Sequence, residues 1–335
     1  MRIEIISTPN DTLKETGFGG LKACKSVLES IKKQGHEVRL SICKSSKDLY
    51  DVVRRNPDLA VLAVKYISTA KDQDIWLSDY FSRHAINYTG SPRDILTFDS
   101  DKVHAKWRLR SMGVQTANYL TAVPGQYKNE KHLTVPFPLF LKPTDAANGN
   151  GVDDASLVTS FAQFEIKLSS LHARFQVPVL AEEFLNGREF TVAIIKSDTD
   201  KLIVSLIEIV PLESTNGLRI LGEEAKKADS EELKKPEDSE LVERVKALAI
   251  DVFNKLGVRD FGRVDIKTKT SGECFFLETN LVPGMTAGSS YFPKACEIGS
   301  DLSYDKVIEL IIANGLNRVR GGSENPEVEM ALGLS

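Results

Sequence analysis

The sequence "FGRVDIKTKTSGECFFLETNLVPGMT" holds two polar pairs whose residue types could bind metal ions and phosphate. Arg263 and Asp265 are two positions apart in one apolar run, and Glu278 and Asn280 are two positions apart in the next. Side chains two apart on a β-strand share a face, so a hairpin would bring both pairs together. Two carboxylates and an amide oxygen suit Mg²⁺, which binds few protein oxygens and completes its shell with water and phosphates. The guanidinium beside them could hold a phosphoryl group.

A solvent-facing hairpin with ordinary cross-strand charges is the alternative interpretation of these four residues. It is the commoner arrangement for any hairpin of unknown context. Glu278, however, follows the apolar "CFFL" and precedes "NLVPG", which is not typical of an exposed strand edge. We therefore favour the metal site.

Two lysines and a glycine-rich loop could add phosphate contacts. Lys142 ends the apolar strand "PLFLK", and the loop "NGNGVDD" follows with Gly149 and Gly151. Backbone N–H groups at such glycines can approach an anion closely. Lys102 follows Asp101 at the start of a predicted helix. Both lysines could instead extend harmlessly to solvent, and the loop lacks the G-x-x-x-x-G-K order of a P-loop.

The stretch "VLAEEFLNGREFTV" places acidic residues at the ends of two predicted strands. The strand-edge backbone near Glu182, Glu183 and Leu185 could pair with a purine. The carboxylate of Glu189 could hold ribose hydroxyls. An acidic linker between two strands explains the same residues equally well.

Composition limits the class of protein. A chain of 335 residues predicts two or three domains. Its 41 % hydrophobic and 27 % charged residues fit a soluble globular protein. A net charge of −4 argues against a nucleic-acid partner, which needs a basic face. Four cysteines without C-x-x-C spacing indicate reduced thiols, and the absence of a signal peptide or long apolar run predicts a cytoplasmic protein with no membrane contact.

The elements that must position these residues follow from apolar periodicity. Strands at residues 2–7, in "HEVRLSIC" and in "DLAVLAV" alternate with helical spacing, which predicts an open parallel α/β domain at the N-terminus. The segments "EFTVAIIKS" and "KLIVSLIEIV" predict a hairpin. The charged run at residues 222–240 predicts an exposed, mobile loop. Further helices are predicted at residues 100–112 (capped by Asp99 or Ser100), 161–173, 239–256 and 304–314.

In this order the motifs resemble the ATP-grasp superfamily and, within it, the D-alanine–D-alanine ligase branch. The matching segments are "LKP", the glycine-rich loop, "EEFLNGREFTV", "GRVDI" and "LETNLVPGMT", and the pattern N-x-x-P-G-M-T after a glutamate is specific to the branch. Residues 86–315 match well, and the first 85 residues match in layout more than in motif. The resemblance implies an α/β fold, α+β in the later parts, in which two subdomains hold ATP between them. The implied divisions are a substrate-binding domain (1–97), a central subdomain (98–178), a catalytic subdomain (179–320) and a disordered tail (321–335).

The resemblance also implies a role for each matching residue. Lys102 and Lys142 would contact ATP phosphates, Asn148, Gly149 and Gly151 would form the lid loop over them, and Glu182, Glu183, Leu185 and Glu189 would hold adenosine. Asp265, Glu278 and Asn280 would bind two Mg²⁺ ions, with Mn²⁺ as a substitute. Arg263 would stabilise the transferring phosphoryl group, Gly284 and Ser289 would face the acyl substrate, and Glu15 could meet a substrate ammonium.

The implied reaction is an ATP-dependent ligation of a carboxylate to an amine. Phosphoryl transfer to the carboxylate would give an acyl phosphate, and attack by the amine would give an amide, ADP and phosphate. The partners would be two amino acids or amino-acid-like molecules, and the resemblance implies a homodimer.

Departures from the branch pattern fall on the amino-acid pockets. "STPNDTLKETGFGG" replaces Gly-Gly-x-Ser-x-Glu, and "AVKYISTAKDQD", with Lys65 and Tyr66, replaces a His-Gly segment. "NGLRILGEEAKKAD" lacks the usual tyrosine and offers Arg219 and Lys226 or Lys227 instead, and Ser289–Ser290 stands in place of Ser-Leu. We therefore predict substrates that need not be two D-alanines. The alternatives are an authentic D-alanine–D-alanine ligase with a divergent first domain, and an inactive nucleotide-binding regulatory protein.

Overall fold

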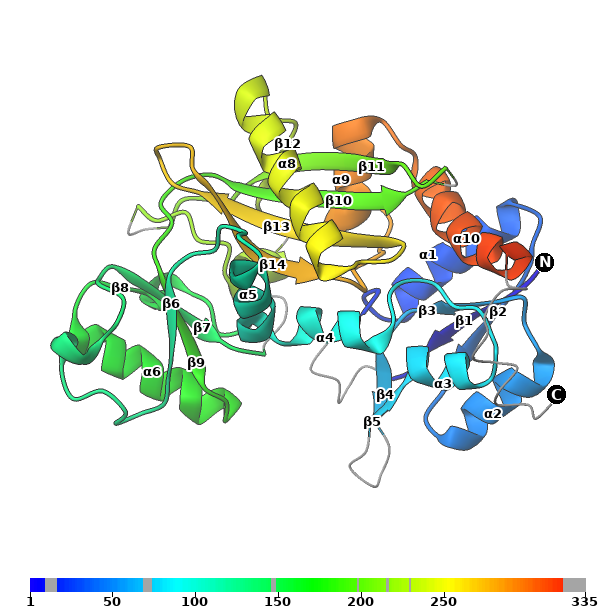
Figure 1. Cartoon of the computed structure of the whole chain (residues 1–335), viewed down its shortest axis with the longest axis horizontal. Helices are drawn as coiled ribbons and strands as arrows, with labels where there is room; N and C mark the ends of the chain where they lie inside the picture. Colours follow the sequence, from blue (N-terminus) through cyan, green and yellow to red (C-terminus); the bar gives the residue numbers. More distant parts are fainter. Residues whose placement is uncertain are drawn as a thin grey trace.

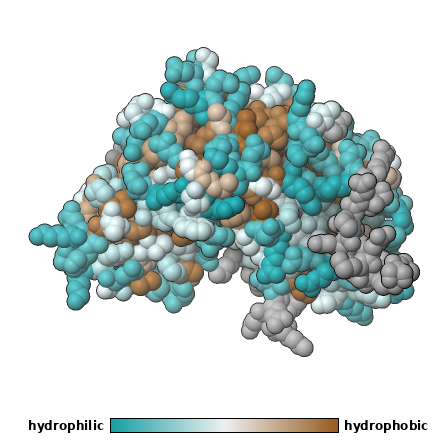
Figure 2. All heavy atoms as spheres, viewed as in Figure 1, coloured by the Kyte–Doolittle hydropathy of each residue, from teal (hydrophilic) through white to brown (hydrophobic). Residues whose placement is uncertain are grey.

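The computed structural model shows an elongated molecule in which helices and strands alternate around three main sheets (Figure 1). No helix within the described part of the chain is long and apolar enough to span a membrane. The view in Figure 2 is largely hydrophilic, with apolar side chains gathered beside α8 where β10 and β11 reach this face. The structure describes residues 1–9, 17–68, 74–145, 149–197, 199–214, 217–228 and 230–321.

The N-terminal sheet is parallel, with strand order β2-β1-β3, as the apolar runs predicted. Its central strand pairs Ile5 with both Leu40 and Val61, and the buried side chains of β1 and β3 pack under the helices. A two-stranded β4-β5 ribbon follows. The elements are β1 (Arg2–Ser7), α1 (Leu21–Lys33), β2 (Glu37–Ile42), α2 (Ser46–Arg55), β3 (Leu59–Leu62), β4 (Tyr66–Ser68), β5 (Asp74–Trp76) and α3 (Leu77–Arg83).

The helix predicted at residues 100–112 is present, and a second helix that was not predicted precedes it. They are α4 (Arg93–Ser100) and α5 (Lys102–Ser111), and Asp101 separates them. The predicted caps, Asp99 and Ser100, are wrong, because Asp101 has an extended backbone and its carboxylate accepts from the His104 N–H at 2.8 Å. Asp99 instead accepts from the Leu281 N–H at 2.7 Å. It therefore ties α4 to the segment that follows β14.

A four-stranded sheet, β6-β9-β7-β8, carries helix α6 on one face. Leu139, Leu141, Val179 and Ala181 of the sheet share a core with Phe164 of the helix. Because β9 pairs with both β6 and β7, this sheet extends beyond the expected division at residue 178. The elements are β6 (Tyr119–Ala122), β7 (Leu139–Pro143), β8 (Leu157–Val158), α6 (Phe161–Phe175), β9 (Val179–Glu183) and the 3₁₀ turns η2 (Glu130–His132) and η3 (Asp154–Ser156).

The five-stranded antiparallel sheet, β12-β11-β10-β13-β14, is buried on both faces. Along β10, Val192 and Ile194 belong to the core beneath α8, while Ala193 and Ile195 belong to the core beneath α9 and α10. The predicted β10–β11 hairpin is confirmed. The elements are β10 (Glu189–Lys196), β11 (Leu202–Val210), α8 (Ser239–Leu256), β13 (Phe261–Thr268), β14 (Cys274–Asn280), α9 (Tyr291–Ser300) and α10 (Tyr304–Gly321).

The charged run at residues 222–240 is not the exposed loop that we predicted. It contains helix α7 (Glu223–Ala228) and strand β12 (Glu232–Lys234). Strand β12 adds to the edge of the five-stranded sheet, with Leu233 opposite Ile209 and packed against the core. A strand forms at residues 232–234 because the apolar Leu233 and a free sheet edge outweigh the charge of the neighbouring residues. Residues 322–335, most of the predicted tail, lie outside the described residues.

Candidate active site

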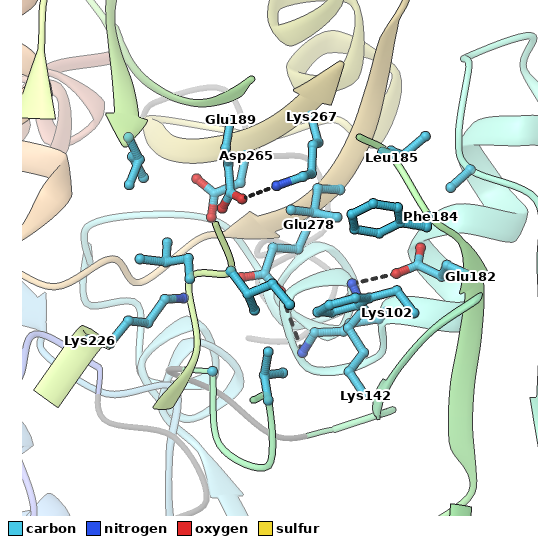
Figure 3. A pocket seen from close by; sticks show the side chains of 18 of the residues that line it. Lys102, Lys142, Glu182, Phe184, Leu185, Glu189, Lys226, Asp265, Lys267 and Glu278 are labelled. Atoms are coloured by element: carbon cyan, nitrogen blue, oxygen red, sulfur yellow. Dashed lines mark hydrogen bonds and ion pairs between the residues drawn. The ribbon is translucent and has the colours of Figure 1, made fainter. Parts of the chain in front are cut away.

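A cavity of about 950 Å³, counting the part open to solvent, opens between the four-stranded and five-stranded sheets. Residues of β7 and β9 line one side, and residues of β10, β13 and β14 line the other (Figure 3). Helices α5 and α7 contribute Lys102 and Lys226. The cavity therefore collects side chains from elements far apart in the sequence.

The two polar pairs of the β13–β14 hairpin do lie together. Asp265 is opposite Glu278 and Arg263 is opposite Asn280, and the register shifts by one residue just after Asp265. The Arg263 guanidinium donates to both oxygens of Asp265, at 3.0 and 2.8 Å. Thr191 of the neighbouring strand donates to the same carboxylate at 2.7 Å, and Asn280 Nδ2 does so at 3.2 Å. Asp265 is therefore fixed on three sides.

The two carboxylates differ in their electrostatic setting. Burial would raise the pKa of Glu278, but the charges of Lys102, Lys226, Lys142 and Arg263 outweigh it and lower the pKa to about 2. Burial raises the pKa of Asp265, and the negative charge of Glu278 adds to this effect although Arg263 opposes it. A second negative charge beside Glu278 is thus unfavourable without a further cation.

The donor set fits a hard divalent cation. Asp265, Glu278 and Asn280 offer carboxylate and amide oxygens, the ligand type of Mg²⁺. Within the residues the structure describes, no cluster of three or more His, Cys, Asp or Glu side chains forms a metal cage of its own. Such a site leaves coordination positions for water and phosphate oxygens, which is how Mg²⁺ is held beside nucleotides.

A buried glutamate holds two lysines at the wall of the cavity. Glu182 lies 2.6 Å from Lys142 Nζ through one oxygen and 2.6 Å from Lys106 Nζ through the other. Burial opposes ionisation of Glu182, but both lysine charges outweigh it and lower its pKa to about 2. Lys142 lines the cavity, and Lys106, which the sequence reasoning missed, is fully buried behind it. The Glu182 carboxylate thus faces these lysines, and the contact of Glu182 with adenosine stays a prediction.

Lys102 reaches the same space from the first turn of α5, 3.7 Å from Glu278 Oε2 (Figure 3). The position follows from the Asp101 cap, which places Lys102 at the first helical residue. The two lysines predicted to contact phosphates therefore lie along the cavity near the carboxylate pair.

Apolar side chains and further carboxylates also line the cavity. Phe140 and Phe184 stack with ring centres 6.4 Å apart, and Leu185 lies beside them in the lining. Glu189 is paired with Lys267 at 2.8 Å. Glu183, also in the lining, lies 3.5 Å from Lys269. Phe140 and Lys267 were not found from the sequence, although Lys267 lies two residues after Asp265 and so shares its strand face.

The glycine loop borders the cavity through Gly149 and Asn150. Gly149 and Gly151 have positive φ angles of 71° and 79°, a conformation that favours glycine. Asn148, the other residue predicted for this loop, lies outside the described residues, as does Glu15.

The residues predicted to face the acyl substrate are not in the cavity lining. A Cβ atom on Gly284 would lie 2.8 Å from Ser290 Oγ, so this glycine allows the turn to close. Ser290, not Ser289, makes the side-chain contact there, because its hydroxyl accepts from the Thr286 N–H at 2.9 Å. Tyr291 does line the cavity, with the Arg263 guanidinium 5.5 Å from its ring centre.

Lys226 and Arg219 also line the cavity. We predicted both as possible replacements for a missing tyrosine, but we also predicted that residues 222–240, which include Lys226, form a mobile loop. Helix α7 accounts for the position of Lys226, since its backbone N–H donates to Gly222 O at 3.1 Å.

This fold and site define the class of protein. Two α+β lobes enclose a cavity with paired carboxylates, an arginine and lysines, which is the arrangement of an ATP-grasp ligase. Residues 109–313 match the family model described as D-ala D-ala ligase C-terminus. The chain belongs to the D-alanine–D-alanine ligase family, whose members form amide bonds at the expense of ATP.

Individual relatives agree with this assignment. The D-alanine–D-alanine ligase of Pelobacter propionicus is 31 % identical over 241 residues, which cover 71 % of this chain and 73 % of the relative. The crystal structure of the D-alanine–D-alanine ligase from Bacillus anthracis superposes with a TM-score of 0.74 at 22 % identity, covering 97 % of this chain and 100 % of that one. A D-Ala:D-Ser ligase from Enterococcus faecalis gives a TM-score of 0.69 at 20 % identity, covering 93 % and 98 %.

These comparisons confirm the ATP-grasp fold class and the amide-forming ligase that the sequence motifs indicated. They favour an enzyme over the alternative of an inactive regulatory protein. They do not assign individual residues, so the roles of the site residues stay predictions.

Proposed function

We propose that this protein joins two amino acids or amino-acid-like molecules through an acyl-phosphate intermediate, with release of ADP and phosphate. The observation that carries the proposal is the Asp265–Glu278 pair of the β13–β14 ladder, set beside Arg263 and open to a cavity that Lys102 and Lys142 also line. A carboxylate does not acylate an amine directly, because oxide is a poor leaving group. Phosphorylation of the carboxylate supplies a stable one.

The residues present divide this task. Lys102 and Lys142 would fix the phosphates of ATP by charge, and Arg263 would stabilise the phosphoryl group in transfer. Asp265, Glu278 and Asn280 would hold Mg²⁺, as two ions or with Mn²⁺ in its place. The bound cation would neutralise phosphate charge. Phosphoryl transfer of this kind depends on positioning and electrostatics and needs no protein nucleophile.

The nucleotide would lie with its base against Phe184 and Leu185 and its ribose near Glu189. These residues and the cationic residues all line the same cavity. The combination suits a molecule with an apolar base and an anionic tail.

The substrates proposed here need not be two D-alanines, the pair in the names of most relatives. The departures lie in the amino-acid pockets, and one of them has a structural consequence. Lys65 is 4 % exposed and lies 3.2 Å from Asp99 Oδ1 and 3.0 Å from Ser100 Oγ. Its ammonium is thus engaged by the C-terminal end of α4.

A panel of amino-acid pairs tests this function. Phosphate release from ATP would be measured for each pair, with mass spectrometry of the products. We expect an amide product for at least one pair and equal amounts of ADP and amide. Best turnover with D-alanine alone would refute the claim about substrates, and ATP binding without turnover for every pair would refute the function.

We further propose that the protein acts in the cytoplasm as a homodimer formed through the first domain. Both proposals rest on resemblance to the family. Sedimentation of the purified chain would test the dimer.

A further inference from the structure

Glu223, at the start of helix α7, joins three parts of the molecule beside the cavity. One carboxylate oxygen accepts from the Gly151 N–H at 2.9 Å. The same carboxylate accepts hydrogen bonds from two guanidinium nitrogens of Arg174 on α6, at 3.0 and 3.1 Å. The glycine loop of the four-stranded lobe is thereby connected to α7 of the five-stranded lobe. We call Glu223, Arg174 and Gly151 the Glu223 clamp.

Helix α6 completes the clamp from the other side. Lys167 donates to the Gly151 carbonyl at 3.0 Å and to Asp153 Oδ1 at 2.7 Å. Lys167 and Arg174 are seven residues apart, two helical turns, so they lie on the same face of α6. Gly151 is therefore held by its carbonyl through Lys167 and by its N–H through Glu223. The peptide units on both sides of Gly151 are thus each tied by one hydrogen bond, which restricts the motion of this glycine.

The backbone around the clamp is packed too closely to admit side chains. The Glu223 N–H donates to Val152 O at 3.0 Å, and a Cβ atom on Gly222 would lie 2.6 Å from that same oxygen. A Cβ atom on Gly151 would lie 2.7 Å from the Phe175 ring. Gly149 and Val152 on one side and Leu221 and Lys226 on the other all line the cavity. At the wall of the cavity, the clamp thus joins the glycine loop of one lobe to the start of α7 in the other.

We propose that Glu223 is a positioning residue of the ligase reaction, which keeps water from the activated carboxylate by holding the glycine loop against α7. This inference rests on the proposed acyl-phosphate intermediate. Water that reaches the intermediate adds to it and returns the free carboxylate and inorganic phosphate, so ATP is consumed without an amide. A closed wall prevents that reaction until the amine attacks.

The test compares phosphate released with amide formed, using the best substrate pair from the panel. Glu223→Ala removes the contacts of this residue with Gly151 and with Arg174. Glu223→Gln removes the ion pair with Arg174 but keeps an oxygen that can accept from the Gly151 N–H. Arg174→Ala removes the ion pair and keeps the Glu223 carboxylate. Arg244→Ala is the matched control, because Arg244 pairs with Glu240 at 3.2 Å on α8 and is as exposed as Arg174. We expect about one phosphate per amide in the wild type and the control. We expect about ten or more per amide in Glu223→Ala, with the other two variants between.

Hydrogen exchange gives a readout that needs no substrate. The Gly151 and Glu223 amides should exchange about tenfold faster in Glu223→Ala than in the wild type, and Arg244→Ala should leave them unchanged. If Glu223→Ala and Glu223→Gln lower the melting temperature but keep the wild-type ratio of phosphate to amide, the residue is structural and the proposal is overturned. Unchanged exchange at Gly151 in Glu223→Ala would also overturn the proposal for Glu223. This test does not depend on the substrate panel, whose failure to give any amide would refute the proposed function instead.

Discussion

Asp265 and Glu278 face each other directly across the β13–β14 ladder, and different cations serve the two carboxylates. Arg263 donates to Asp265 through two nitrogens, whereas Glu278 pairs with Lys102 at 3.7 Å. Asp265 is thus fixed by its own strand, while Glu278 is held more loosely and faces the cavity. A cation bound at Asp265 would have to displace or share one of the four hydrogen bonds that this carboxylate accepts.

Replacement of Glu278 or of Arg263 should stop the reaction. Glu278→Gln removes a charged ligand, and Arg263→Ala removes the guanidinium that would meet the phosphoryl group. We expect each to lower phosphate release by about 10³-fold or more. Glu278→Gln should keep a melting temperature near that of the wild type, whereas Arg263→Ala should lower it, because Asp265 loses its buried partner. Glu273→Gln, on an exposed position of the same hairpin, is the control and should keep full activity. Near-normal turnover in Glu278→Gln would contradict the metal assignment.

Removal of the negative charge at Glu182 should destabilise the fold. Glu182→Gln leaves the ammonium groups of Lys106 and Lys142 buried without their shared partner. Breaking a buried pair of this kind costs about 3–5 kcal/mol. Urea unfolding would measure the loss, with the exposed Glu165→Gln on α6 as a control that should change little. Equal free energies of unfolding for Glu182→Gln and Glu165→Gln would show that the ion pairs of Glu182 with the two lysines do not stabilise the fold.

The same residue predicts a pH dependence. The pKa of Glu182 falls from its ordinary 4.5 to about 2, because both lysine charges outweigh the effect of burial. A depressed pKa contributes stability that is complete above the unfolded value and is lost as the pH falls through the folded value. The difference in melting temperature between wild type and Glu182→Gln should therefore be largest above about pH 5 and shrink toward pH 2. A difference that stays constant over this range would contradict the prediction.

Local patterns were sufficient to predict the carboxylate pair. Arg263 and Asp265 share a strand face by period two, and a short hairpin leaves few registers for Glu278 and Asn280. The parallel first sheet and the β10–β11 hairpin followed from apolar runs in the same way. All of these depend on residues close in sequence.

Contacts between distant elements could not be predicted. Lys106 meets Glu182 only because α5 packs against α8 and β14, and no spacing in the sequence encodes that arrangement. Strand β12 is three residues long and charged, so its pattern is that of a loop until a sheet edge is available. The Asp101 cap was missed because three candidate residues precede the helix, and only the backbone conformation distinguishes them.

Glu189 is expected to select the sugar of the nucleotide. Its carboxylate lies 2.8 Å from Lys267 Nζ in the cavity wall. If the carboxylate accepts from a ribose hydroxyl, Glu189→Gln should weaken the use of ATP more than that of 2′-deoxy-ATP. A hydrogen bond to a charged group corresponds to about a tenfold or larger effect, so the ratio of kcat/KM values for the two nucleotides should fall toward one. Lys267→Met leaves the carboxylate in place without its partner, and we expect it to raise KM for both nucleotides with little change in kcat. An unchanged preference in Glu189→Gln would place the ribose elsewhere in the cavity.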